Sequence, residues 1–354
     1  MANPHSDTEK AITRGIQYLH QHQFPNGEFC AYMSADDPMQ GWVLPISIIF
    51  PTALICQSLQ FIKNHEDEFV ESMLKKAESF LWYQVGTGAT WNHFTRLHPL
   101  CGVCPQDVDD TVCVSLFLRT QMDGFPESVN RQLILDNRNS EGLIYTWFTF
   151  RWKFNHNLFY WRISLAELKH PLKSFLFWRQ TEANRYDIDA VVNANALLYL
   201  RSIPETQPII NYLIKIISEE REGDCDVWYR NQYSVYYFFT RPYYAGISQL
   251  EPIRQPIIDR IRSKIDSSGR IGESHLDTAF SACALMNLHY QGPELDAAVE
   301  YLISKQRPTG EWERRLVYYG GPKKLAGYGG EELVTGFCLE ALARYQETSL
   351  KKQG

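Results

Sequence analysis

The chain has 354 residues and a formal net charge of −6, and its Lys and Arg residues are scattered. It therefore lacks the clustered positive charge that a nucleic-acid surface needs. The start of the chain shows no basic segment followed by an apolar one, and no window reaches the roughly 18 apolar residues of a membrane span. We expect a soluble, cytoplasmic protein without a nucleic-acid partner, and a peripheral contact with a membrane stays open.

The eight cysteines are spread through the chain, and several of them lie inside apolar runs. A small secreted domain would show a dense disulfide framework instead, so we interpret them as buried thiols of a reducing compartment. Cys101 and Cys104 form one CxxC pair, but no second pair or HxxxH nearby completes a four-ligand zinc site. The sequence therefore predicts no metal site.

A repeated motif opens the chain and returns near its end. Residues 14–29 and 300–312 share Tyr-Leu, three residues, Gln, three residues, and then Gly-Glu and an aromatic residue. Each copy has apolar residues at helical spacing followed by a Pro-x-Gly breaker, which is typical of a helix end. A third, degenerate copy lies at 80–91. The motif indicates a repeat architecture.

Apolar helices rich in small residues follow these breakers. Such helices are buried on most of their surface, whereas segments such as 68–81 alternate as amphipathic outer helices. The candidates for inner helices begin at Pro51, Asp109, Asp187, Gln232, Leu276 and Glu332. The pattern predicts an all-α fold, a single α/α toroid of about six inner and six outer helices. No linker interrupts it, so we expect one domain over 1–354, with an inserted or lid region around 120–180.

Three aspartates crowd the start of one predicted inner helix, in the sequence DVDDT from Asp107 to Thr111. One Asp suffices to cap a helix, which stabilises it by about 0.5 to 2 kcal/mol, so three exceed what a cap needs. Neighbouring carboxyl groups cannot all ionise, and apolar surroundings raise their pKa values further. A helix N-terminus at Pro105 would oppose this by stabilising anions. The cluster predicts coupled acids that retain a proton.

The repeats and the aspartates together resemble the motifs of the terpenoid cyclase and protein prenyltransferase superfamily, whose domains are α/α toroids. The repeats are similar to its QW motifs, and Asp107, Asp109 and Asp110 resemble the DxDD motif of class II terpene cyclases. The resemblance runs from Arg14 to the last helix. It implies that Asp109 protonates a linear isoprenoid or prenyl diphosphate and starts a carbocation cyclisation, with Asp107 and Asp110 in support.

A carbocation needs walls that stabilise positive charge without reacting, and aromatic faces do this at roughly 0.5 to 2 kcal/mol for each ring. Aromatic residues make up 14% of the chain. The candidates for such walls lie near the starts of inner helices, and they are Trp42, Trp228, Tyr229, Tyr233 and Tyr237.

Further polar residues occupy the same rim. Asp189 and Asp277 hold the place of Asp109 in their own repeats, where they would hydrogen-bond within the pocket or cap their helices; capping is favoured. The resemblance also implies a histidine partner for the acid, and the sequence does not rank the candidates His156, His170 and His275.

The loop 314–330 precedes the last inner helix, and its glycines and cations could receive a diphosphate, with Arg314 and Lys323 as candidate ligands. A solvated surface loop is the favoured interpretation. Proton transfer needs no cofactor, and Mg²⁺ would assist only if the substrate is a diphosphate. The sequence lacks a DDxxD motif, the nearest fragment being Asp36-Asp37, so metal-dependent ionisation is disfavoured.

Class II cyclases usually place the cavity between two barrels, and this chain has length for one. A homodimer, the insertion around 120–180 or a smaller substrate would complete the cavity. Three other functions stay open. A zinc-dependent prenyltransferase-like enzyme is one, although Asp224-Cys225 has the wrong spacing for an Asp-x-Cys pair. A glycan-active toroid would use paired carboxylates, and a non-enzymatic toroid would bind a partner on its rim.

Overall fold

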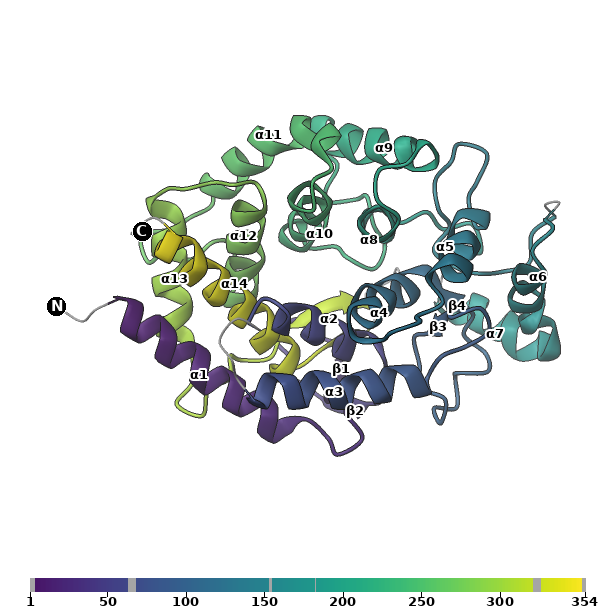
Figure 1. Cartoon of the computed structure of the whole chain (residues 1–354), viewed down its shortest axis with the longest axis horizontal. Coiled ribbons are helices and arrows are strands. Elements are labelled where there is room, and N and C mark those ends of the chain that lie inside the picture. Colours follow the sequence, from purple (N-terminus) through teal and green to yellow (C-terminus); the bar gives the residue numbers. More distant parts are fainter. Residues whose placement is uncertain (1–3, 63–67, 153–154, 182, 321–325, 352–354) are drawn as a thin grey trace.

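The structure is a computed structural model that describes residues 4–62, 68–152, 155–181, 183–320 and 326–351. Within these ranges, six helices form a closed inner ring (Figure 1). They are α2 (Phe50–Leu59), α4 (Val108–Gln121), α8 (Ala190–Leu200), α10 (Gln232–Tyr244), α12 (His275–Asn287) and α14 (Glu331–Lys351). Each contacts the next, and α14 returns to α2. Every residue of α2, α8 and α12 is buried, which explains their apolar sequences with many small residues.

A second layer of helices surrounds this ring. Its members are α1 (Pro4–His22), α3 (Glu68–Tyr83), α5 (Glu127–Asp136), α9 (Gln207–Ser218), α11 (Glu251–Arg262) and α13 (Pro293–Lys305). These helices bury one stripe only, as in α9, where the buried residues are Ile209, Ile210, Leu213, Ile216 and Ile217. The predicted α/α toroid is confirmed.

The repeated motif forms the turn between an outer helix and the next inner helix. At Gly310 the φ angle is +108°, and a Cβ atom there would lie 2.3 Å from the carbonyl oxygen of Arg14, so only glycine fits. Gln306 donates to the carbonyl of Gly310 at 2.7 Å and to Ala11 of α1 at 2.8 Å. The motif thus ties the turn to the neighbouring outer helix.

The structure contains copies of this turn that the sequence analysis missed. Glycines with positive φ occupy the equivalent place at 27, 88, 142, 269 and 310. In two of them an isoleucine, Ile144 or Ile271, replaces the aromatic residue, and both pair across the turn as Phe29 does with Gln23. The copies were missed because the backbone conformation is kept while the side chain that marks it in the sequence is not.

A small antiparallel sheet is added to the helices, with the strand order β2 (Val43–Ile46), β1 (Ala31–Ser34), β6 (Gly327–Gly329), β5 (Leu316–Tyr319). A second sheet pairs β3 (Trp91–Asn92) with β4 (Gln106–Asp107). The expectation of a solvated surface loop at 314–330 is wrong for its described residues, because β5 is almost wholly buried and β6 pairs with β1.

Two further helices lie outside the ring, at the right of Figure 1. In the chain they follow α5 and precede α8. They are α6 (Leu158–Ser164) and α7 (Pro171–Thr181), joined by a short 3-10 turn (Ala166–Lys169). Other 3-10 turns precede α9 (Pro204–Thr206) and α11 (Ser248–Leu250). Helix α5 belongs to the outer layer, so the added helices begin only after it.

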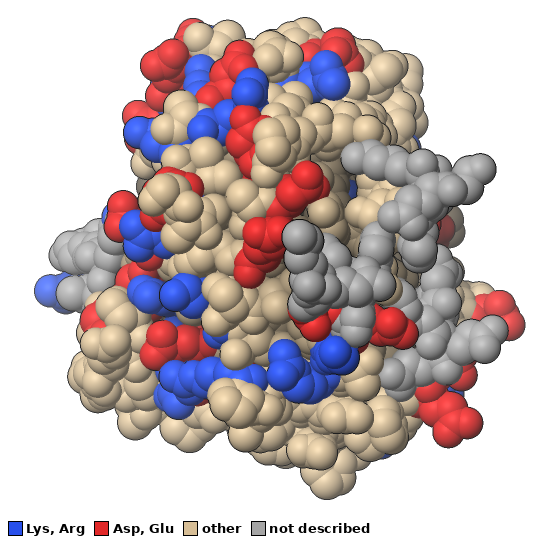
Figure 2. Space-filling model, turned by 90° about the vertical axis from the view of Figure 1, so that its left-hand side faces the viewer, with Lys and Arg blue, Asp and Glu red and all other residues tan. Residues whose placement is uncertain are grey.

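Figure 2 shows the face on the side of both chain ends, where basic and acidic side chains are interspersed. Among the described residues, no helix combines the length and the apolar character that crossing a membrane requires.

Candidate active site

The three aspartates are buried in the first turn of α4, with exposed fractions of 6% for Asp107, 9% for Asp109 and 2% for Asp110. Asp107 is the N-cap residue, and its Oδ1 accepts the backbone N–H of Asp110 at 2.7 Å. Its backbone is held opposite Trp91 in the β3–β4 pair. One of the three carboxyl groups therefore suffices to cap the helix, and the side chains of Asp109 and Asp110 are left for other roles.

Asp109 reaches toward the next inner helices of the ring. Its Oδ1 accepts a hydrogen bond from Nδ2 of Asn195 on α8, and its Oδ2 accepts one from the hydroxyl of Tyr229, both at 2.8 Å. Burial raises the pKa of Asp109 to about 7, with a further increase from Asp107, although the two hydrogen bonds oppose the shift. Burial thus outweighs the two hydrogen bonds, and the acid keeps a large protonated fraction near neutral pH.

The other two carboxyl groups are also held toward the neutral form. Burial raises the pKa of Asp110 to about 7, and burial together with Asp110 raises the pKa of Asp107 well above its usual range. Oδ2 of Asp110 lies 3.4 Å from Nδ1 of His93. Burial lowers the pKa of His93 to about 4, so its ring is neutral and supplies no positive charge. The cluster retains protons because burial is not compensated by a cation.

His93 is the histidine beside the acids, and the sequence analysis did not name it. It lies two residues after the aromatic residue Trp91 of the third repeat, where β3 brings it next to the end of β4. Its place directly after the third repeat was the sequence signal that could have identified His93 as a candidate. The candidates from the sequence are not among the described residues that line the cavity: His156, His170 and His275.

A cavity of about 410 Å³ opens beside the aspartates. All three carboxyl groups and His93 line it, and the rest of the wall is mostly apolar. The aromatic residues of the wall are Phe50, Phe94, Trp147, Phe177, Trp228, Tyr229, Tyr318, Tyr319 and Tyr328. Such a chamber offers several ring faces to a positive charge and little polar surface to react with it.

Helix α7 supplies one wall of this cavity. Lys173, Leu176, Phe177, Gln180 and Thr181 line it, and their spacing of three and four residues places them on one helix face. Helix α7 therefore contributes a wall to the cavity from within the same chain. The polar residues of this wall lie in its first and last turns, whereas the acids come from the ring.

No protein-family model and no curated sequence matches the chain. Solved structures do match it. A type II terpene cyclase, MstE from Scytonema, in complex with the product merosterolic acid A, has a TM-score of 0.70 at 13% identity over 97% of this chain and 98% of that chain. The chain has the fold of a type II terpene cyclase. MstE in complex with the substrate geranylgeranyl dihydroxybenzoate matches with a TM-score of 0.69 at 14% identity over 97% and 99% of the two chains.

Two other solved structures also match the chain. A protein from Actinoplanes has a TM-score of 0.68 at 16% identity over 95% of this chain and 99% of that chain. A possible member of the GH105 family from Klebsiella pneumoniae matches less well, with a TM-score of 0.55 at 11% identity over 99% and 94%. Because the MstE structure is covered almost completely, the type II cyclase fold is present in a chain of one toroid.

Two of the five predicted aromatic wall residues line the cavity, Trp228 and Tyr229. The other three lie elsewhere in the structure. Trp42 is 46% exposed, because it precedes the outer strand β2 of the sheet. Tyr233 and Tyr237 are buried in α10 but are not among the described residues of the wall. The hydroxyl of Tyr237 donates to Glu340 at 2.8 Å, so this side chain points toward α14.

The predicted substrate contacts of Asp189 and Asp277 are not observed, since neither lines the cavity within the described part of the chain. Capping is wrong for Asp189, whose side chain does not cap α8. It accepts hydrogen bonds from Thr146 at 2.6 Å and from the indole N–H of Trp228 at 3.0 Å, and both residues line the cavity. Asp277 accepts from Asn231 at 2.6 Å, while Ser274 caps α12. Asp189 is therefore a support for the wall.

Of the two predicted diphosphate ligands, the structure describes only Arg314. Arg314 is paired with Glu331 at 2.6 Å and is not a described residue of the wall. Lys323 lies outside the described residues. The hairpin of β5 and β6 contributes Tyr318 and Tyr328 to the cavity instead, which makes it an aromatic wall.

Proposed function

We propose that the protein is a class II-type terpene cyclase in which Asp109 is the general acid. The observation that carries the proposal is a buried carboxyl group, with its pKa raised to about 7, that faces a cavity lined with aromatic rings. Protonating an alkene requires an acid that is neutral, close to the substrate and shielded from water. The fold shared with MstE supports this assignment, since MstE is a type II terpene cyclase.

In the proposed reaction, Asp109 transfers its proton to a carbon atom of a terminal double bond. A C–H bond forms from the alkene electron pair, and the neighbouring carbon becomes a carbocation that the remaining double bonds attack. The carboxylate left on Asp109 is stabilised by the hydrogen bonds from Asn195 and Tyr229. When the final cation loses a proton, the overall change is an isomerisation, and a proton must return to Asp109 before the next cycle.

The neighbouring residues help to keep this acid protonated. Asp107 and Asp110 disfavour ionisation of the cluster through like-charge repulsion. His93, neutral beside Asp110, offers a path by which a proton could return to the cluster. Trp228 and Tyr318 present their rings to the cavity, at roughly 0.5 to 2 kcal/mol of stabilisation for each well-placed ring.

The substrate would bind with its hydrocarbon end at the acids and its polar end at α7. Lys173, Gln180 and Thr181 are the polar residues of that wall, and Lys173 is the only Lys or Arg among the described lining residues. This arrangement favours a linear isoprenoid with a small polar or singly charged head. Mg²⁺ would take part only if the head is a diphosphate, and no step above requires it. Helix α7 supplies part of the cavity wall from within one chain, so the proposal needs no second copy of the protein.

The alternatives have less support. The described residues contain no group of three His, Cys, Asp or Glu side chains arranged to hold a metal ion, and the Sγ atom of Cys225 is engaged with the carbonyl of Glu222. The similarity to a possible GH105 member keeps a glycan substrate as a second candidate. Sugars need many hydrogen-bonding partners, and the wall here is mostly apolar.

The test is to incubate the purified protein with linear isoprenoids of ten to thirty carbons, as free hydrocarbons, as diphosphates and linked to an aromatic acid. We expect a cyclic product from one class, with one deuterium per molecule from the initiating step when the reaction runs in D₂O. The control is Asp109→Asn, which keeps the size of the side chain and removes the acid. Equal conversion by the two proteins would refute the role of Asp109, and conversion of glycans alone would favour the second candidate.

A further inference from the structure

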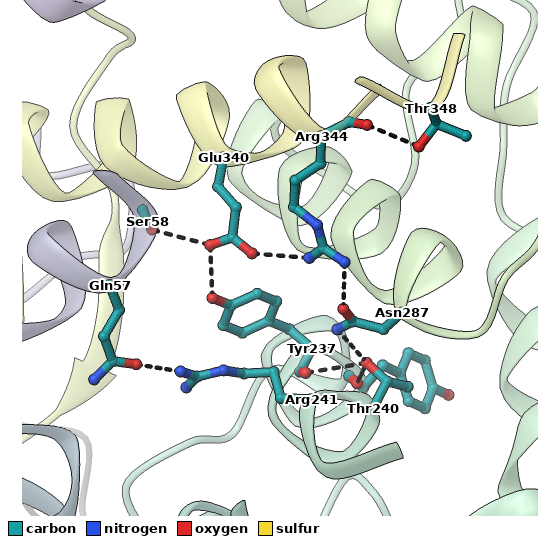
Figure 3. Close-up of polar contacts among 10 residues, drawn as sticks. Gln57, Ser58, Tyr237, Thr240, Arg241, Asn287, Glu340, Arg344 and Thr348 are labelled. Carbon is teal, nitrogen blue, oxygen red and sulfur yellow. Dashed lines mark hydrogen bonds and ion pairs between the residues drawn. The ribbon is translucent and has the colours of Figure 1, made fainter. Parts of the chain in front are cut away.

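A line of hydrogen-bonded side chains runs from the acid across the inner ring. Asn195 on α8 donates to Oδ1 of Asp109 at 2.8 Å, and Nη1 of Arg241 on α10 donates to Oδ1 of Asn195 at 3.4 Å. The other guanidinium nitrogen, Nη2, donates to Oε1 of Gln57 on α2 (Figure 3). Nε2 of Gln57 donates to the carbonyl of Cys113 on α4 at 2.6 Å. The line returns to the helix of Asp109 one turn after it.

Each amide in this line has only one orientation that satisfies its neighbours. An amide side chain has a donor end and an acceptor end, whereas a guanidinium group can only donate and a backbone carbonyl can only accept. Gln57 must turn its NH₂ group to Cys113 and its oxygen to Arg241. Asn195 must turn its oxygen to Arg241, so its NH₂ group faces Asp109.

The orientation of Asn195 decides which oxygen of Asp109 carries the proton. Oδ1 accepts the amide N–H of Asn195. A proton on Oδ1 would point at this N–H donor and would find no acceptor there, so it is disfavoured. Oδ2 faces the hydroxyl of Tyr229, which can rotate its own hydrogen to suit either form of the acid. We propose that Arg241 is a positioning residue: it fixes the amide of Asn195 and thereby confines the transferable proton of Asp109 to Oδ2. Its consequence for catalysis rests on the proposed cyclase function, but the amide orientation does not.

Arg241 is itself held by two aromatic rings of its own helix, α10. Its guanidinium lies over the rings of Tyr237 and Phe238, at 5.5 and 5.7 Å from their centres. Tyr237 is in turn bonded to Glu340 of α14, as Figure 3 shows. Arg241 is not a described residue of the cavity wall, so it acts on the acid through Asn195 and not by touching substrate.

Several other titratable groups face Asp109 and influence its pKa. The carboxyl groups come from α4 and the start of α8, and they are Asp107, Asp110 and Asp189. The weaker acids and the imidazole are neutral at pH 7, because burial shifts their pKa values away from that range; they are Cys113, Tyr229, Tyr318 and His93. A change at Arg241 leaves all of these groups in place.

Replacing Arg241 by methionine removes the donor that orients the amide. Asn195 can then turn its oxygen toward Asp109 and accept a proton from Oδ1. This arrangement stabilises the neutral acid with its proton on the wrong oxygen. We therefore expect the pKa of Asp109 to rise while its reactivity falls, a combination that mere loosening of the fold would not produce.

The experiment is a titration of the full-length protein labelled with ¹³C at the aspartate carboxyl carbons and followed by NMR. Asp109→Asn identifies the resonance of Asp109 by its loss. We expect Arg241→Met to raise the apparent pKa of Asp109 by about one unit, and Arg241→Lys to stay close to the parent value, since an ammonium group is also a pure donor. An unchanged pKa in Arg241→Met would overturn the proposal.

A double-mutant cycle separates the amide from the direct effect of charge. In an Asn195→Leu background the amide is absent, so Arg241→Met should cause no further shift. An equal shift in both backgrounds would mean that the charge acts through space, and the positioning role would be refuted. If Arg241→Met does not fold, as judged by its thermal transition, Arg241→Gln tests the same point, because its own amide can flip and cannot enforce the orientation.

Turnover adds an independent readout. With a substrate in hand, Arg241→Met should lower kcat by about 10-fold, or about 1.4 kcal/mol, and move the alkaline limb of the pH profile to higher pH. A lower kcat with an unmoved limb would contradict the proposal. If no isoprenoid reacts with the unmodified protein, the cyclase function fails, whereas the NMR titration still decides the role of Arg241.

Discussion

Two buried polar clusters lie inside the ring, and they are built in opposite ways. The acid cluster, Asp107, Asp109, Asp110 and His93, lies at the start of α4. The paired network lies on α2, α10, α12 and α14 and consists of Ser58, Tyr237, Asn287, Glu340 and Arg344 (Figure 3). Both clusters are shielded from solvent, yet one lacks a buried cation and the other contains one.

In the paired network the buried carboxylate has one cation and two hydroxyl groups as partners. Glu340 is 1% exposed and lies 3.0 Å from the guanidinium of Arg344, and its other oxygen accepts from Ser58 at 3.0 Å and Tyr237 at 2.8 Å. Burial opposes the charge of Arg344, but Glu340 together with Cys283, Tyr244 and Tyr237 outweighs it, and the pKa of Arg344 is raised. Asn287 accepts from the same guanidinium at 2.6 Å. The network joins four inner helices with its hydrogen bonds satisfied.

The acid cluster lacks these partners. Among the described residues, Oδ1 of Asp110 and Nε2 of His93 have no hydrogen-bond partner. Burial without a cation favours the neutral form of a carboxyl group, whereas burial with one permits an ion pair. The comparison teaches that the missing cation, and not burial alone, turns a buried aspartate into a candidate acid.

The largest expected effect is on turnover and follows from removing the acid from the acid cluster. Asp109→Asn should lower kcat for cyclisation by about 10³-fold or more, since it removes the general acid, and it should not lower the free energy of unfolding. Product formation and urea unfolding of the same preparation measure the two effects. A variant that still cyclises at more than a tenth of the parent rate would exclude Asp109 as the acid.

Breaking the paired network should affect stability instead. Glu340→Ala leaves the buried cation of Arg344 without its carboxylate, and we expect a loss of about 3 to 5 kcal/mol in the free energy of unfolding. The matched control is Glu313→Ala, which removes the exposed pair of Arg307 and Glu313 at 3.1 Å and should cost less than about 1 kcal/mol. Similar losses in the two variants would show that the network is not a structural tie.

The pH dependence sharpens the contrast. The folded pKa of Asp109 is raised from 3.8 to about 7, so the folded state binds more protons than the unfolded state between these values. The free energy of unfolding should therefore fall as pH rises from about 4 to 7, by roughly 4 kcal/mol from this group alone. Asp109→Asn should remove that part of the slope. An unchanged slope in the variant would contradict the raised pKa.

The smallest expected effect concerns the wall that α7 forms. Lys173→Met should raise KM for a substrate with an anionic head by about 10-fold and leave kcat close to its parent value, because in our proposal Lys173 contacts only the polar end. A substrate with a neutral head serves as the control and should not respond. A fall in kcat for both substrates would place α7 closer to the reacting atoms than we propose.

Local signals in the sequence predicted much of this arrangement. The Pro-x-Gly turns, the apolar inner helices and the crowded aspartates are properties of short segments, so they are visible without a structure. Residues that reach the cavity from distant segments were not predictable in this way. His93 arrives through the β3–β4 pair, and Tyr318 and Tyr328 arrive through the pairing of β6 with β1. Tyr237 was misassigned because helical spacing does not say which neighbour a buried face meets.

The amino-acid sequence by itself determined the alternation of inner and outer helices and the place of Asp109 at the start of one of them, because helix periodicity and turn chemistry act over a few residues. The tertiary structure decided which partners from other elements each buried carboxyl group meets. Asp109 comes to lie against Asn195 and Tyr229, whereas Glu340, already beside Arg344 on its own helix, comes to lie against Ser58 and Tyr237. Closing the ring brings helices far apart in the chain into contact, and the charge state of a buried group depends on those contacts.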